Sequence, residues 1–239
     1  MTFVPEGIAM ASDSRQSITI SSKMHDRGEV NVETVNSDAV TKTFLLEIQG
    51  VGISSFGEDL LGGVPMASHI KRFSEEILAD PDNVETIAQK LVEFITNEFG
   101  KKDCGFHVAG YSKEGKISVP YAYYCHIGRN EIVMKNIKPD KSIAYGATWS
   151  GQGDIVTGLI NPVVMADEKG NKKVVRQAAP IIWEAMTLQD AIDFSVFAIR
   201  TTIDTIRFQA RPKTVGGPID VLIITPSEIK FVKRKELAA

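Results

Sequence analysis

Apolar and polar residues alternate with a period of two along much of the first 54 residues, and this pattern predicts strands. Pro5-Glu6-Gly7 is a predicted tight turn, so the strands on either side of it form a hairpin. The polar stretch 23–38 is predicted to be a surface loop or a protruding hairpin. The strands predicted in this part of the chain are 2–4, 8–14, 15–22, 40–48 and 51–54.

After Asp59 the period changes from 2 to 3.6, which predicts helices. The stripe of the first helix consists of Leu60, Val64, Ala67, Ile70, Phe73 and Ile77. A second helix is predicted from Val84 to Phe99, ending at Gly100. A short third helix runs from residue 154 through Leu159, and a long fourth helix from Leu188 to about Phe208. Further strands are predicted over 104–111, 117–125, 131–137, 141–146, 219–225 and 229–232.

This order of elements predicts an α+β fold with four layers. Strands, two helices, strands, two helices and a final strand pair can form an αββα sandwich of two antiparallel sheets covered by helix pairs. Each element then buries its apolar side. The chain shows no internal repeat and no low-complexity linker, so residues 1–239 are predicted to form a single domain.

Composition and charge exclude several classes of protein. A formal net charge of −3 gives no basis for a nucleic-acid partner. No apolar run is long enough for a membrane span, and no secretory signal is visible at the start, so the predicted location is cytoplasmic. The four histidines lack metal-ligand spacing and are predicted to be surface or core residues, so no metal or cofactor is expected. Cys104 and Cys125 are predicted to fill the core.

Four short motifs carry a resemblance to a known family. They are 6–15 (Glu-Gly-Ile-Ala-Met-Ala-Ser-Asp-Ser-Arg), 40–44 together with 51–58, 146–154 (Gly-Ala-Thr-Trp-Ser-Gly-Gln-Gly-Asp) and 215–226 (Val-Gly-Gly-Pro-Ile-Asp-Val-Leu-Ile-Ile-Thr-Pro). In these motifs the chain resembles the 20S proteasome-type subunits, which are N-terminal nucleophile hydrolases, and especially the bacterial proteasome-like proteins. The resemblance implies a threonine-type peptidase that forms a homo-oligomeric ring and acts on peptide or amide substrates.

The same resemblance implies roles for individual residues. In such enzymes an N-terminal Thr attacks the carbonyl and its own amine serves as the base. Asp13 matches the aspartate that orients a catalytic lysine, and Ser150 matches a serine beside the active site. The alignment places Ala39 where that lysine belongs. Lys42 lies three residues away and is predicted to point to the opposite face of a strand.

Thr2 is the candidate nucleophile, but its distance from the expected position is large. The chain has about four residues fewer before the turn than the family, which displaces Thr2 by about 13 Å along the strand. Met1 would also acylate the Thr2 amine. Thr214 is a partial substitute for a supporting Asp and Ser pair, and Asp220 is predicted to be structural.

Three functions remain open at this point. The first is an active threonine-type peptidase, whose missing residues would come from a start codon upstream of Met1. The second is a non-catalytic ring subunit, favoured by Ala39, Val215 and the short first strand. The third is a small-molecule amidase or binding protein on the same fold, because a fold does not determine a function.

Overall fold

Two five-stranded antiparallel sheets form the centre of the computed structural model, which describes residues 1–24, 28–79, 82–167 and 169–236. The first sheet has the order β12 (Gly146–Ala147), β1 (Thr2–Val4), β2 (Gly7–Ser12), β15 (Asp220–Ile224) and β16 (Ile229–Lys233). The second has the order β11 (Glu131–Met134), β10 (Ile117–His126), β9 (Cys104–Glu114), β6 (Val51–Gly57) and β5 (Thr43–Leu46). Strands distant in the sequence thus become neighbours, such as β2 and β15.

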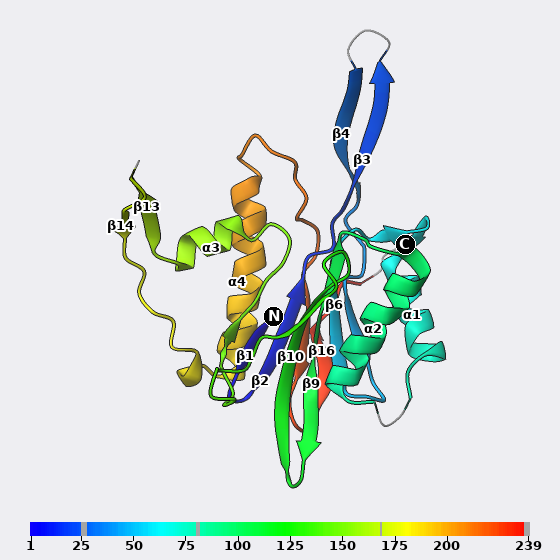
Figure 1. Ribbon diagram of the computed structural model, residues 1–239, viewed down its shortest axis with the longest axis vertical. Coiled ribbons are helices and arrows are strands. Elements are labelled where there is room, and N and C mark those ends of the chain that lie inside the picture. Colours follow the sequence, from blue (N-terminus) through cyan, green and yellow to red (C-terminus); the bar gives the residue numbers. More distant parts are fainter. Residues whose placement is uncertain (25–27, 80–81, 168, 237–239) are drawn as a thin grey trace.

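Helices pack against both sheets (Figure 1). They are α1 (Met66–Glu76), α2 (Val84–Phe99), α3 (Asp154–Ile160) and α4 (Leu188–Ile206), with a single 3₁₀ turn at Trp183–Ala185. The spacing of Ile87, Leu91 and Ile95 puts them on one face of α2, and all three are fully buried in a cluster with residues of β6 and β9. On the other sheet, Ala191 of α4 packs against Val4 and Ala9.

A smaller apolar cluster lies between the two sheets. Phe3, Ile8 and Met10 of the first sheet meet Ala109 and Ala122 of the second. The α+β class and the antiparallel pairing are therefore as predicted. The complete four-layer order remains a prediction. The short helix α3 has its main contacts with the helix α4 and not with a sheet, so the predicted pair of helices covering this sheet is not confirmed.

Three two-stranded ribbons accompany the sheets. They are β3 (Gln16–Met24) with β4 (Gly28–Ser37), β7 (Leu60–Leu61) with β8 (Val64–Pro65), and β13 (Val163–Ala166) with β14 (Lys172–Arg176). The β3–β4 ribbon projects from the body of the molecule (Figure 1), so the predicted protruding hairpin is confirmed except at 25–27, which lie outside the described residues. The β13–β14 ribbon was not predicted.

The predicted start of the first helix is wrong. Leu60 and Val64 belong to the β7–β8 ribbon, whose turn uses Gly62 and Gly63 at positive φ, and the helix begins only at Met66. A left-handed backbone at two successive residues is incompatible with an α-helix, so the apolar stripe is interrupted there. In the described residues no helix is long and apolar enough to cross a membrane.

The start of α2 depends on a single side chain. The Oδ1 atom of Asn83 accepts a hydrogen bond of 2.9 Å from the Thr86 backbone N–H. Replacing Asn83 by Ala removes this cap and is expected to lower the free energy of unfolding by about 1 kcal/mol. Chemical denaturation measures this loss, and Asn83→Asp, which keeps an acceptor, should restore most of it. Equal losses in the two variants would contradict the capping role.

Candidate functional site

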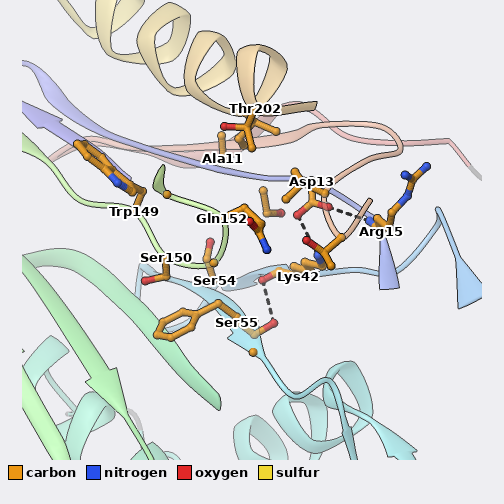
Figure 2. A pocket seen from close by; sticks show the side chains of 18 of the residues that line it. Ala11, Asp13, Arg15, Lys42, Ser54, Ser55, Trp149, Ser150, Gln152 and Thr202 are labelled. Carbon is orange, nitrogen blue, oxygen red and sulfur yellow. Dashed lines mark hydrogen bonds and ion pairs between the residues drawn. The ribbon is translucent and has the colours of Figure 1, made fainter. Parts of the chain in front are cut away.

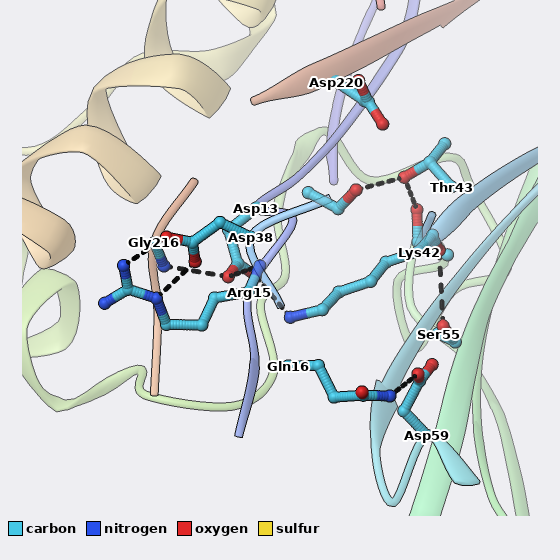
Figure 3. Close-up of polar contacts among 12 residues, drawn as sticks. Asp13, Arg15, Gln16, Asp38, Lys42, Thr43, Ser55, Asp59, Gly216 and Asp220 are labelled. Atoms are coloured by element: carbon cyan, nitrogen blue, oxygen red, sulfur yellow. Dashed lines mark hydrogen bonds and ion pairs between the residues drawn. The ribbon is translucent and has the colours of Figure 1, made fainter. Parts of the chain in front are cut away.

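Asp13 is the centre of a polar cluster at the end of β2. Its Oδ1 atom accepts a hydrogen bond of 2.8 Å from Lys42 Nζ, and its Oδ2 atom accepts bonds from the backbone N–H groups of Arg15 (3.1 Å) and Gly216 (3.0 Å). Because β15 runs antiparallel to β2 with Asp220 opposite Ser12, the loop before β15 lies beside Asp13. Figure 3 shows these contacts.

Lys42 does not point away from Asp13, so the predicted orientation is wrong. The prediction assumed a strand from residue 40, in which side chains alternate between faces. In the structure β5 starts only at Thr43, and residues 38–42 have no regular strand geometry. The Lys42 side chain therefore reaches Asp13. Both side chains are mostly buried, with 17% of the Lys42 side chain and 13% of the Asp13 side chain exposed. Lys42, and not Ala39, supplies the ammonium group at this site.

A second ion pair holds the neighbouring loops together. The Arg15 guanidinium binds both carboxylate oxygens of Asp38, at 2.6 and 2.7 Å, and lowers the pKa of that carboxyl group. Arg15 also donates to the Lys213 carbonyl oxygen at 3.1 Å. Gly216 lies so close that an added Cβ would stand 2.3 Å from Arg15 Cζ. The guanidinium therefore packs directly against the loop carrying the N–H group that binds Asp13, and a larger side chain at 216 would displace it.

Thr2 lies far along the hairpin from this cluster. It pairs with Ala9 in β2, so Asp13 is four residues farther on, about 13 Å of extended chain. The Thr2 hydroxyl is buried and shares a hydrogen bond of 2.8 Å with Ser195 on α4. The sequence-predicted candidate nucleophile is thus engaged by the helix that covers the first sheet.

Ser150 forms a hydrogen bond with a histidine that the sequence did not single out. Its Oγ atom lies 2.9 Å from Nε2 of His107 on β9, while the N-cap position of α3 belongs to Gly153. His107 is buried, and burial lowers its pKa to about 3. It was predicted as a surface or core residue, and its place within an apolar strand agrees with the core. Ser150 is 43 positions farther along the chain, and this separation concealed their contact.

These side chains surround one cavity of about 600 Å³ (Figure 2). Asp13, Lys42, His107, Ser150 and Thr2 all line it. Its apolar wall includes Ile18, Phe56, Leu60, Trp149, Val156, Phe194 and Ile199. Polar and apolar side chains thus share the cavity wall, and a cavity in which polar groups converge is typical of a small-ligand or catalytic site.

Other predicted residues lie at the edges of this site. Thr214 lines the cavity, and its buried hydroxyl has no hydrogen-bond partner among the described residues. Asp220 is buried and accepts a 2.7 Å hydrogen bond from the Lys235 backbone N–H, besides an ion pair with the Lys235 ammonium, which agrees with a structural role. Cys104 and Cys125 are buried, and burial raises the pKa of each thiol to about 12, so neither is a reactive thiolate.

The buried histidine has a consequence for stability in acid. His107 stays neutral in the folded protein down to its pKa of about 3, whereas an unfolded histidine gains a proton below about pH 6.5. The folded state therefore binds fewer protons, and this residue lowers stability as the pH falls. At pH 5 the expected loss is about 2 kcal/mol, from 1.5 pH units at about 1.4 kcal/mol each.

Urea unfolding of the wild type and of a His107→Gln variant, at pH 7 and pH 5, measures this difference. The variant should lose about 2 kcal/mol less than the wild type between these two pH values. Identical losses would show that His107 is protonated in the folded protein.

Comparisons with known proteins support the fold alone. No family model matches the chain, and no curated protein matches it. Among solved structures it is similar to the Anbu (Gly-1) mutant from Hyphomicrobium sp. strain MC1, with 12% sequence identity, a TM-score of 0.50, and coverage of 96% of this chain and 86% of that chain. The assignment to the 20S proteasome-type subunit family is therefore wrong. What the comparison shows is that the chain has a fold similar to that of this solved structure.

Proposed function

We propose that this chain is a single-domain amide hydrolase that cleaves a peptide or related amide bond in the cavity beside Lys42. The observation that carries this proposal is the Lys42–Asp13 pair, with its 2.8 Å contact, on the wall of a cavity of about 600 Å³. Two backbone N–H groups hold the Asp13 carboxylate, which in turn orients the Lys42 ammonium. A fixed positive charge in a cavity with apolar walls stabilises negative charge that develops on a substrate.

Amide hydrolysis uses such a charge directly. A hydroxyl group attacks the carbonyl carbon, the carbonyl oxygen becomes an oxyanion, and the proton of the hydroxyl ends on the departing amine. Water then releases the acyl group as a carboxylic acid. The cavity wall supplies hydroxyl groups on Thr2, Ser54 and Ser150.

A threonine-type reaction at Thr2 receives little support from these contacts. The Thr2 hydroxyl would have to give up its hydrogen bond to Ser195 and act at a distance from the Lys42 charge. Ser54 is the alternative hydroxyl on the cavity wall, and its Oγ lies 2.8 Å from Oγ1 of Thr43, the residue after Lys42. Thr43 also donates to Ser12 at 2.8 Å, so the wall beside Lys42 is a chain of hydroxyl groups.

Turnover of a panel of fluorogenic peptidyl amides by the purified full chain tests this proposal. The released amine should increase linearly with time, and the activity that releases it should co-elute with the protein on size exclusion. Alanine variants of Thr2 and Ser54 then compare the two hydroxyl groups, with turnover expected to survive the change at Thr2. A folded protein that releases no amine from any member of the panel would contradict amide hydrolysis.

A second candidate, a non-catalytic subunit of a homo-oligomeric ring, is favoured by the β13–β14 ribbon. Within the described part of the chain β13 and β14 pair only with each other, and their apolar side chains Val163, Val164, Met165, Val174 and Val175 are 39–61% exposed. Exposed apolar strands with unpaired edges are typical association surfaces, here toward a second copy of the chain. Light scattering at micromolar concentration distinguishes the cases, because a strict monomer would exclude this ring.

A further inference from the structure

Ser150 and His107 form a hydroxyl–imidazole pair on the cavity wall that resembles a nucleophile with its base. The Nε2–Oγ distance is 2.9 Å, within hydrogen-bond reach. Two roles are possible for such a pair. Either the imidazole takes the serine proton and Ser150 attacks, or the imidazole holds the hydroxyl and Ser150 donates a hydrogen bond to the substrate.

The far side of the imidazole decides between these roles. His107 Nδ1 is buried and has no hydrogen-bond partner among the described residues. The ring lies instead among aromatic side chains, with centroids 5.4 Å from Phe56 and 5.7 Å from Tyr124. A serine–histidine base needs an acceptor on Nδ1 that stabilises the imidazolium formed when the proton arrives. No such group contacts the ring here, and burial disfavours the charged form.

The neutral ring then has one hydrogen to place on one of two nitrogens. If Nδ1 carried it, a buried N–H donor would have no acceptor, and orphaned N–H groups are rarer in proteins than acceptors lacking a partner. The hydrogen therefore belongs on Nε2, where it is donated to Ser150 Oγ. The Ser150 hydroxyl hydrogen is left free, and Ser150 is half-buried on the cavity wall.

We infer that the Ser150 hydroxyl is a fixed hydrogen-bond donor to the carbonyl oxygen of the bound amide, and that His107 is the positioning residue that aims it. Lys42 and Ser150 would then provide charge and hydrogen bond for the same developing oxyanion. This inference rests on the proposed amide hydrolysis. It excludes Ser150 as the attacking group.

Nitrogen-15 NMR of the full chain, labelled at histidine, tests the hydrogen placement without any substrate. The His107 resonances, assigned with a His107→Gln variant, should show a protonated Nε2 and an unprotonated Nδ1 at pH 7. A protonated Nδ1 would overturn the inference. Because this measurement needs no turnover, its failure is distinguishable from a failure of the proposed hydrolysis, which would appear as an inactive wild type.

Kinetics on a fluorogenic peptidyl amide test the donor role. Ser150→Ala should lower kcat by about 10²–10³-fold with little change in KM, because the hydrogen bond strengthens as the oxyanion forms. His107→Gln keeps an N–H donor and should recover most of the rate, whereas His107→Phe should resemble Ser150→Ala. Ser142→Ala, at a surface serine bonded to Asp140, is the matched control and should be unchanged.

Two results would overturn the donor role. One is covalent labelling of Ser150 by a fluorophosphonate, detected by peptide mass spectrometry, which would show an activated nucleophile. The other is an unchanged kcat in Ser150→Ala.

Discussion

Replacing Lys42 by Met is expected to lower kcat/KM for a fluorogenic peptidyl amide by about 10²–10³-fold. Methionine keeps the length and apolar stem of the side chain but removes the positive charge beside the reacting carbonyl. Asp13 still accepts hydrogen bonds from the backbone N–H groups of Arg15 and Gly216, so the loop around it keeps two of its three contacts. Initial rates, normalised to the folded fraction from circular dichroism, give the effect.

The control for this change is Lys71→Met. Lys71 lies on α1 with its side chain 74% exposed, in a pair with Glu75. Its removal should leave the rate within a factor of two, roughly the noise of such an assay at an exposed site. A co-purified peptidase would be recognised because its activity would persist in preparations of the Lys42→Met variant. Equal rates in the two variants would show that the Lys42 ammonium takes no part in turnover.

Replacing Asp13 by Ala is expected to lower the free energy of unfolding by about 3–5 kcal/mol. The change leaves the mostly buried Lys42 ammonium without its carboxylate and leaves the N–H groups of Arg15 and Gly216 without their acceptor. Breaking one side of a buried ion pair costs far more than the pair itself contributes. Urea unfolding followed by circular dichroism measures the loss.

Two further variants show whether the loss comes from the unpaired charge. In Asp13→Ala/Lys42→Met the ammonium is absent, so part of the stability should return. Asp38→Ala breaks the pair with Arg15. Because the Asp38 side chain is 45% exposed, this change should lower the free energy of unfolding by less than about 1 kcal/mol. If the double variant were no more stable than Asp13→Ala alone, the loss would come from the backbone contacts.

Periodicity was sufficient for elements that bury one face in a regular way. The 3.6-residue spacing of Ile87, Leu91 and Ile95 predicted α2, and Gly100 at φ 70° marks its end. Periodicity failed where the pattern of apolar residues does not match the burial of a regular element. The β13–β14 ribbon is exposed along its length and carries no alternation to detect. Leu60 and Val64 continue a helical stripe, yet they lie in a ribbon whose turn needs two glycines.

The four short motifs indicated how the chain turns and did not establish membership of a family. Gly217 has a φ of 74° and lies against the Asp38 backbone oxygen, and such constraints belong to any chain that turns in this way. The motifs therefore pointed to a fold like that of Anbu, while no family model matches the chain. A likeness in small turn residues does not transfer a nucleophile. Thr2 illustrates this, since its hydroxyl binds α4.

By itself the sequence determined the helices and strands that bury one face in a regular way, and that Asp13 directly follows an apolar strand, because these depend on neighbours within a few residues. Only the tertiary structure decided what Asp13 and Ser150 contact. Lys42 reaches Asp13 across 29 residues, and His107 reaches Ser150 across 43. Such pairs depend on where strands start and how sheets stack. A slip of one residue in the pairing of two strands moves every side chain of a strand to the other face of the sheet.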